Sequence, residues 1–225
     1  MTKVKTEAIV LDRVAYGEKD LVLTFLTSEH GVISAIAKGA RGSKRRFAWL
    51  DLFVRLSVIF VPKALPKLWV VQEANVLEVY SGIFENLERL EAGQAIVALS
   101  KDSLRDAPQM SELYSKIVGV LGWLSSAPPE HAHIAVLETA HIIIEALGHG
   151  RMCEQCQRDI VASNLAAFLM PSFNFVCSEC GTKGLGVLID QAQMKALFLR
   201  EDIGKQATFA LISTVWRLFT QRTPL

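Results

Sequence analysis

Residues 52–61 read LFVRLSVIFV, and this stretch decides how the first third of the chain is built. Its alternating apolar positions are Leu52, Val54, Leu56, Val58 and Phe60. The positions between them include Arg55 and Ser57. Because successive side chains of a β-strand point to opposite faces, this period of two predicts a strand with one apolar face toward a core.

Four neighbouring segments have the same strand character and are separated by turn signals. They are residues 4–14, 21–27, 32–38 and 68–79. Residues 28–31 (Ser-Glu-His-Gly) are expected to form a hairpin turn between the second and third strands. Five short strands joined by turns instead of crossover helices predict a small, partly closed β-barrel of the OB-fold type.

After Ser81-Gly82 the apolar residues recur at intervals of three and four, which predicts helices. The helical faces are Ala92, Ala95, Ile96 and Leu99; Leu113, Ile117, Val120, Leu121 and Leu124; Ile134, Leu137, Ala140, Ile144 and Leu147; and Phe209, Ile212, Trp216 and Phe219. Asp190 with Gln193 predicts the start of a further helix. We interpret Phe209, Trp216, Phe219 and Trp123 as core residues. The expected class is α+β, with an OB-fold nucleic-acid-binding domain at 1–80 and a helical domain at 81–225.

Composition places the chain among ordinary globular proteins. It has 225 residues, of which 51% are hydrophobic and 21% charged, so it is long enough to bury a core without disulfides. The longest stretch without a charge, residues 160–178, contains Asn164 and Pro171, which a bilayer would penalise. The N-terminus lacks the pattern of a signal peptide. We therefore expect no membrane association and a cytoplasmic, nucleoid-associated protein.

Charge is distributed unevenly along the chain. The net charge is +1 overall, but it is +4 over residues 1–80, −5 over 81–150 and +2 over 151–225. Residues 31–50 contain no acid. Within them lie five cations, Lys38, Arg41, Lys44, Arg45 and Arg46.

This basic segment is expected between the third and fourth strands, where a barrel presents a loop. Its cations can neutralise phosphates, and Phe47 or Trp49 can stack on an unpaired base. The alternative is a solvated loop whose charges aid only solubility. The lack of acids and the flanking aromatics favour nucleic-acid binding.

All four cysteines lie in two Cys-x-x-Cys pairs, Cys153 with Cys156 and Cys177 with Cys180, separated by twenty residues. Two such pairs supply four thiolates for a tetrahedral shell that suits Zn²⁺ and leaves no open coordination position. The alternatives are two redox pairs or buried free thiols; a redox pair is expected at the start of a helix beside a strand. We predict a structural zinc module at residues 151–182.

Motifs of catalysis are lacking. The sequence has no phosphate-binding loop, nucleophile elbow or His-Glu-x-x-His motif. A zinc deaminase is excluded because no histidine has a glutamate two residues on and Val176 precedes Cys177 where proline is expected. Glu138-x-x-His141 has no second copy, so we interpret it as an ordinary pair on a helix. We therefore expect no enzyme.

Several segments together resemble one known family. They are Glu7-Ala8-Ile9-Val10-Leu11, Tyr16-Gly17-Glu18-Lys19-Asp20, Leu26-Thr27 with Gly31, Lys38-Gly39-Ala40-Arg41, residues 50–53 and 68–73, and Leu147-Gly148 before the first cysteine pair. In these features the chain resembles the bacterial recombination mediator RecO. Two departures are Gly42, where a second basic residue is common, and Ser172-Phe173-Asn174, where a glycine-rich turn is expected.

The resemblance implies a function that needs no catalytic site. Members of the family bind single- and double-stranded DNA and anneal complementary strands. They bind the acidic C-terminal tail of single-stranded DNA-binding protein and work with RecR to load RecA. We expect the same of this chain, with the tail docked on residues 82–225. The rival interpretations are a zinc-containing transcription or RNA-binding module and a scaffold that docks proteins.

Overall fold

The computed structural model describes residues 3–43, 46–63, 68–104, 111–170, 174–181 and 186–220, with side chains as far as residue 215. The chain forms two compact units, Met1–Ala127 and Pro128–Leu225. Within the described residues, no helix has the length and apolar character needed to cross a membrane.

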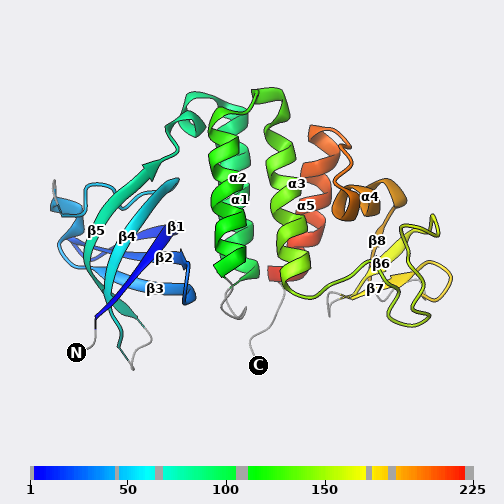
Figure 1. Ribbon diagram of the computed structural model, residues 1–225, viewed down its shortest axis with the longest axis horizontal. Coiled ribbons are helices and arrows are strands. Elements are labelled where there is room, and N and C mark those ends of the chain that lie inside the picture. The colour runs from blue at the N-terminus through cyan, green and yellow to red at the C-terminus, as the bar shows by residue number, and fades with distance from the viewer. Residues whose placement is uncertain are drawn as a thin grey trace. The chain divides into compact units, whose positions relative to one another are not determined.

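Five strands of the first unit close into a barrel in the order β1-β2-β3-β5-β4 (Figure 1). They are β1 (Val4–Tyr16), β2 (Asp20–Thr27), β3 (Gly31–Ala37), β4 (Val54–Val61) and β5 (Trp69–Val79). Neighbouring strands are antiparallel except β3 and β5, which pair in parallel through Ala35 and Trp69. The predicted five-stranded OB-fold barrel is confirmed, and the hairpin turn between β2 and β3 lies where it was expected.

Strand β4 has the alternation that its sequence predicts. Val54, Leu56, Val58 and Phe60 are buried in the barrel core, and Leu52 packs against it partly buried. The strand begins only at Val54 because Phe53 has a φ of 60°, which takes its backbone out of the extended region. The Phe53 ring instead lies against the Phe84 ring, with centroids 5.3 Å apart.

In the described part of the first unit, a short 3₁₀ turn, η2 (Ser81–Glu85), is followed by the helices α1 (Leu87–Ser103) and α2 (Ser111–Ser126). The Asn86 side chain caps α1 by accepting hydrogen bonds from the N–H groups of Glu88 and Arg89. Lys101 on α1 forms an ion pair with Asp12 of β1 at 3.2 Å. Strands thus give way to helices near residue 81, as predicted. The helices α1 and α2 belong to the same compact unit as the barrel. The domain boundary near residue 81 therefore stays a prediction.

The buried face of α2 consists of the predicted residues Leu113, Ile117, Val120, Leu121 and Leu124, together with Tyr114. Trp123 is 43% exposed, so its assignment to the core is wrong. At 100° per residue, Trp123 is turned well away from both Leu121 and Leu124, which places it at the edge of the apolar stripe.

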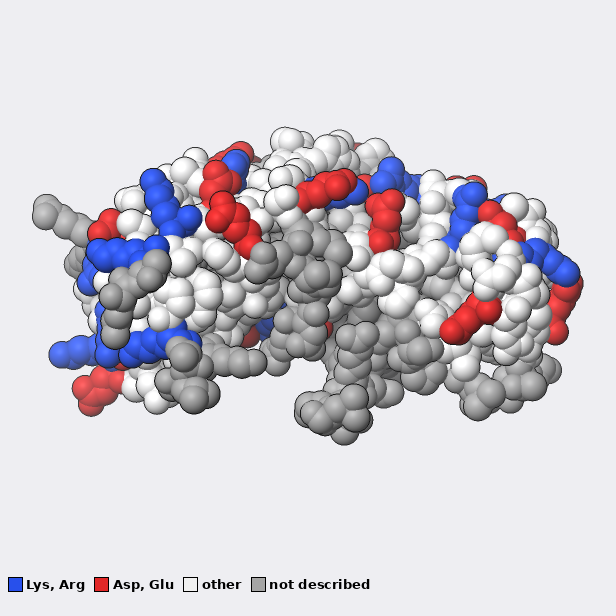
Figure 2. Space-filling model, turned by 60° about the horizontal axis from the view of Figure 1, so that its bottom comes forward, with Lys and Arg blue, Asp and Glu red and all other residues white. Residues whose placement is uncertain are grey.

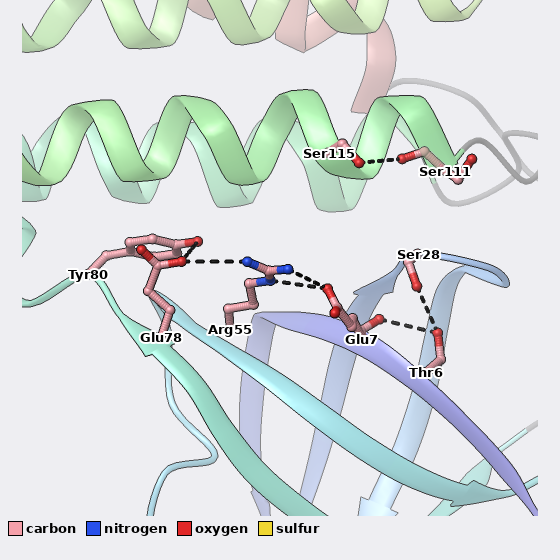
Figure 3. Close-up of polar contacts among 8 residues, drawn as sticks. All are labelled: Thr6, Glu7, Ser28, Arg55, Glu78, Tyr80, Ser111 and Ser115. Atoms are coloured by element: carbon pink, nitrogen blue, oxygen red, sulfur yellow. Dashed lines mark hydrogen bonds and ion pairs between the residues drawn. The ribbon is translucent and has the colours of Figure 1, made fainter.

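A polar layer connects strands of the barrel below α2 (Figure 3). The Arg55 guanidinium of β4 donates to Glu7 Oε2 of β1 at 2.7 Å and lies 3.7 Å from Glu78 Oε2 of β5. The Tyr80 hydroxyl donates to Glu78 at 3.2 Å. Burial and the neighbouring carboxylate raise the pKa of Tyr80 well above its usual range. Arg55 therefore cross-links three strands on the outer surface of the barrel.

Within the described residues, the second unit combines helices with a small sheet of order β7-β6-β8. Its elements are η3 (Pro129–His131), α3 (Ala132–Ala146), β6 (Ala167–Leu169), β7 (Phe175–Cys177), β8 (Val187–Ile189), α4 (Gln191–Leu199) and α5 (Lys205–Thr220). Asp190 and Gln193 form a reciprocal capping box at the start of α4, which confirms the predicted helix start. On α5, Ile212 is buried and Phe209 is half-buried, whereas the side chains of Trp216 and Phe219 lie outside the described part.

Side chains of α3 connect to the segment around α4. His141 Nδ1 donates to the Leu197 carbonyl at 2.7 Å, and Glu138 pairs with Arg200 at 2.8 Å. Glu138 and His141 thus each bond to a residue outside α3, and their interpretation as a pair on one helix stays a prediction. His133 Nε2 and Asp202 Oδ1 are 2.8 Å apart.

Candidate functional site

The basic segment begins at the end of β3 and is held against the turn between β1 and β2. Gly39 has a φ of 70°, and its N–H donates to Asp20 Oδ1 at 2.7 Å. The Arg41 N–H, in the 3₁₀ turn η1 (Ala40–Gly42), donates to the Lys19 carbonyl at 3.0 Å. These bonds fix the start of the segment.

The described cations of this segment are all exposed. Lys38, Arg41 and Arg46 lie at the surface, and Lys44 and Arg45 lie outside the described residues. The Arg41 guanidinium donates to the carbonyls of Gly17 and Glu18 at 3.1 and 3.2 Å. Arg46 Nε donates to the Gln72 carbonyl at 2.6 Å. Both guanidinium groups are thus held by main-chain carbonyls, which leave their positive charge uncompensated.

In Figure 2 several Lys and Arg side chains lie at the surface of the barrel unit, with some Asp and Glu side chains among them. This pattern follows the net charges of the sequence, with the basic excess in residues 1–80. A surface of this kind attracts polyanions.

The two aromatic residues of the segment have different environments. Phe47 is 5% exposed and belongs to the barrel core, so the interpretation of Phe47 as a base-stacking residue is wrong. Leu50, three residues further along the chain, belongs to the same core. Trp49 is 55% exposed and remains available for stacking.

A residue that the sequence analysis missed, Arg13, lies next to this segment. A β-bulge shifts the pairing of β1 with β2 between Val10 and Asp12. Beyond the bulge Arg13 pairs with Leu23, a core residue. Directly paired residues of an antiparallel pair share a face, so Arg13 lies on the interior side of the sheet. Before the bulge the even-numbered residues Ala8 and Val10 face the core. Continuing this alternation would place residue 13 on the outer face of the barrel, so its position was not predicted.

Arg13 and Arg41 both line a cavity of about 490 Å³ beside the basic segment. Its other described lining residues are Ala15, Leu21, Ala40, Ser43, Phe47, Ala48 and Leu50. No acidic residue is among the described residues that line it. Arg13 forms an ion pair with Asp51, just beyond this lining.

The four cysteines converge in the second unit. Their Sγ atoms all lie within 4.8 Å of one another, and no other such group of His, Cys, Asp or Glu occurs in the part of the chain that the structure describes. Cys153 and Cys177 are buried, Cys180 is half-buried and Cys156 is exposed. The predicted ligand set is therefore brought together.

Main-chain hydrogen bonds shape the two turns that present these thiols. The Gln157 N–H donates to the Cys153 carbonyl at 2.9 Å, and the Cys180 N–H donates to the Cys177 carbonyl at 3.0 Å. The two turns meet where the Cys177 N–H donates to Cys153 Sγ at 3.3 Å. Gly181 completes the second turn, and a Cβ there would lie 2.4 Å from the Phe168 ring.

The spacing of the sulfur atoms fits a tetrahedral metal site. A Zn–S bond of about 2.3 Å gives a tetrahedron edge of about 3.8 Å. Cys156 Sγ and Cys177 Sγ are 3.8 Å apart. A disulfide requires about 2.05 Å, and all four cysteines are free. The residues present therefore fit a structural metal ion.

The cysteines of the cluster differ in how readily they ionise. Burial acts to raise the pKa of Cys153, but the N–H groups of Cys156, Cys177 and Gln155 outweigh it and lower that pKa to about 6. Hydrogen bonding to the sulfur atoms of Cys177 and Cys156 raises the pKa of Cys180 to about 12. A divalent cation bound by the four sulfur atoms would favour the thiolate form of each.

Comparisons with known proteins agree with this architecture. The family model described as "Recombination protein O N terminal" matches residues 1–80. The DNA repair protein RecO of Desulfosudis oleivorans is 30% identical over 186 residues, which cover 80% of this chain and 72% of that protein. RecO of Anaeromyxobacter dehalogenans strain 2CP-C is 34% identical over 139 residues, 61% of this chain and 55% of the relative. The chain thus spans little more than half the length of that relative.

Proposed function

This chain belongs to the RecO family of DNA repair proteins, and on that premise we propose that it is a DNA-binding recombination mediator. In this function it binds single- and double-stranded DNA, anneals complementary strands and assists the loading of RecA together with RecR. It does so by holding strands and partners together, without nucleotide hydrolysis and without a catalytic site.

The observation that carries this proposal is the set of exposed cations that follows β3. Lys38 and Arg41 are exposed at the start of a segment that contains no acid. Such cations bind phosphates irrespective of sequence and release counterions on binding. The same role is proposed for Lys44, Arg45 and Arg46.

Annealing requires no energy source, because stacking contributes about 1.4 kcal/mol per base-pair step. The barrier is partly repulsion between the phosphates of the two strands. A basic surface that neutralises phosphates lowers this repulsion and raises the local concentration of both strands.

We further propose that the four cysteines hold one Zn²⁺ ion. Its ligands are Cys153, Cys156, Cys177 and Cys180, whose Sγ atoms are already grouped. Four thiolates fill a tetrahedral shell, so the metal stabilises the fold of residues 151–182 and offers no position to a substrate.

Protein partners follow from the family relationship. The proposed partners are RecR and the acidic C-terminal tail of single-stranded DNA-binding protein, the latter docked on residues 82–225. A cytoplasmic location near the nucleoid accompanies this function and is likewise a proposal.

The test mixes complementary oligonucleotides with and without this protein, without nucleotide, first bare and then coated with single-stranded DNA-binding protein. We expect faster annealing on both, slowed by high salt. If annealing is not accelerated in either case, with the protein folded and loaded with zinc, the proposed mediator function is overturned. The interpretation as a scaffold that docks proteins then remains. Binding that depends strongly on base sequence or prefers RNA would instead support the transcription or RNA-binding module.

A further inference from the structure

The two turns that carry the cysteines are held together by hydrogen bonds of the chain itself. The first turn comprises residues 153–157 and the second residues 177–181. The Glu154 N–H donates to a main-chain carbonyl of β7 at 2.9 Å, and the Cys177 N–H donates to Cys153 Sγ at 3.3 Å. Main-chain groups thus join the turns beside the two buried ligands, Cys153 and Cys177.

A side-chain link joins the turns beside the other two ligands. Cys156 is exposed and Cys180 is half-buried. Arg158 follows Cys156 by two positions, and Glu179 directly precedes Cys180. Arg158 Nη1 donates to Glu179 Oε2 at 2.5 Å, and the two side chains form an ion pair. The ligands nearest the surface are therefore bordered along the chain by one ion pair that connects the two turns.

Main-chain hydrogen bonds fix both ends of this ion pair. The Arg158 carbonyl accepts from the Cys153 N–H at 2.8 Å, which holds Arg158 against the first turn. Glu179 lies inside the second turn, where the Gly181 N–H donates to the Cys177 carbonyl at 2.8 Å. An ion pair between two fixed positions restrains the distance between the turns.

A second arginine of the same segment provides a comparison. Arg151 lies two positions before Cys153, as Arg158 lies two positions after Cys156. The Arg151 side chain is 47% exposed, against 48% for Arg158. Arg151 pairs with Asp159 at 2.7 Å, and both residues of this pair precede the second turn. The two arginines thus have the same charge and nearly the same exposure, but Arg158 has its partner in the second turn.

From this geometry we infer that Arg158 and Glu179 are positioning residues of the metal site. Their ion pair holds the two turns at the separation at which the four Sγ atoms meet, and so raises the affinity for the metal ion. Ligands that are already in place lose less conformational freedom on binding, and residues behind the ligands tune metal affinity. The inference rests on the proposed zinc binding and goes beyond it, because it assigns part of the affinity to residues that do not touch the metal.

The alternative is that these two residues act on the metal only through their charges. Four thiolates around a divalent cation leave a net negative charge. A nearby arginine would then strengthen metal binding and a nearby glutamate would weaken it. Loss of the Glu179 charge therefore distinguishes the two explanations, because it weakens binding if the ion pair positions the turns and strengthens binding if charge alone acts.

The test measures the Kd for Zn²⁺ of the full chain, by competition with a chelator of known affinity. We expect Arg158→Gln and Glu179→Gln each to raise this Kd about two- to fivefold, which is what an exposed ion pair contributes. Arg151→Gln is the matched control and should leave the Kd unchanged. Thermal unfolding of the metal-loaded protein checks that each variant is folded.

A charge exchange tests the pair directly. Arg158→Glu and Glu179→Arg each place two like charges together across the turns, so each alone should weaken Zn²⁺ binding. The double variant restores an ion pair with the charges exchanged and should return the Kd toward that of the wild type. Co²⁺ serves as a spectroscopic probe, because its absorption reports tetrahedral coordination by thiolates. This absorption should be restored in the double variant as well.

The outcomes separate this inference from the proposed zinc site. A wild-type protein that binds no Zn²⁺ would overturn the zinc proposal and this inference with it. Binding in the wild type that Glu179→Gln strengthens or leaves unchanged would overturn the positioning role while the zinc site stands. Equal weakening by Arg158→Gln and Arg151→Gln, or no recovery in the double variant, would likewise show that the ion pair does not position the turns.

Discussion

Gly82 lies so close to the end of α2 that a Cβ built on it would be 1.9 Å from the carbonyl oxygen of Ser125. The Gly82 N–H donates to Ser125 Oγ at 3.2 Å. The Arg89 guanidinium donates to the carbonyls of both residues, at 3.1 and 3.3 Å. Gly82 of η2, Arg89 of α1 and Ser125 of α2 thus meet at one point of the first unit. Only glycine at position 82 leaves room for the close approach to the Ser125 carbonyl.

Gly82→Ala should therefore destabilise the first unit. Overpacking against backbone forces a shift of the chain and costs about 1–3 kcal/mol. The measurement is the free energy of unfolding in denaturant. Gly119→Ala is the matched control, because a Cβ at Gly119 of α2 meets nothing within 4 Å and alanine in a helix gains about 0.5–1 kcal/mol. Equal effects of the two variants would contradict the close contact.

The sequence predicted the barrel well because its signals are local. Residues such as Leu56 and Val58 alternate with outward-facing residues, and the strand they form is the strand observed. The two cysteine pairs were equally informative, since their spacing predicts convergence on one point and their Sγ atoms do converge. The sequence also predicted the N-cap at Asp190.

What the sequence did not predict depends on long-range geometry. One β-bulge near Leu11 moves Arg13 to the interior side of its sheet. The residue types around Leu11 do not predict this bulge. Phe47 is buried in the barrel core, although it lies in a basic, glycine-containing segment whose composition indicates an exposed loop. Trp123 lies beside the buried stripe of α2 and is exposed. Each error concerns which way a side chain faces at the edge of a regular pattern.

The cysteine cluster predicts one zinc ion per chain and a local fold that depends on it. Binding in such sites is worth on the order of 10–16 kcal/mol, so Cys177→Ser should unfold at least residues 151–182. Elemental analysis and amide hydrogen exchange measure the two effects. Ser178→Ala is the control, because this neighbouring side chain is exposed. Protein purified without chelator that carries no stoichiometric metal would contradict the prediction.

Acid should weaken the contact between His133 and Asp202. Hydrogen bonds from His133 and from the Gly204 N–H lower the pKa of Asp202 below its ordinary value. A carboxyl whose pKa is lower in the folded state stabilises that state above the unfolded pKa of about 3.9. The stabilisation is lost as pH falls through the lower, folded value.

Asp202→Asn should therefore cost about 0.5–1 kcal/mol at neutral pH, a modest value because half of the Asp202 side chain is exposed. The difference from wild type should shrink as the pH falls below about 4. Unfolding by denaturant at several pH values measures it. The exposed neighbour Glu201 provides the control Glu201→Gln, and a penalty for Asp202→Asn that is constant with pH would argue against an ionised Asp202.

Salt dependence of DNA binding counts the phosphate contacts of the basic segment. Each lost contact lowers the slope of log affinity against log salt concentration by about 0.7–0.9. Lys38→Gln should lower the slope by one such step. Replacing Lys44, Arg45 and Arg46 together should lower it by about 2–3, and affinity should fall alike for unrelated sequences.

The control is Lys116→Gln, which removes an exposed lysine of α2 that pairs with Glu112 at 3.0 Å. An unchanged slope is expected for this variant, because a lysine outside the binding surface releases no counterion from the DNA. A slope that also stays unchanged in the triple variant would mean that the basic segment does not touch the phosphates. The DNA-binding surface would then have to be sought in the second unit, where residues 151–225 carry a net charge of +2.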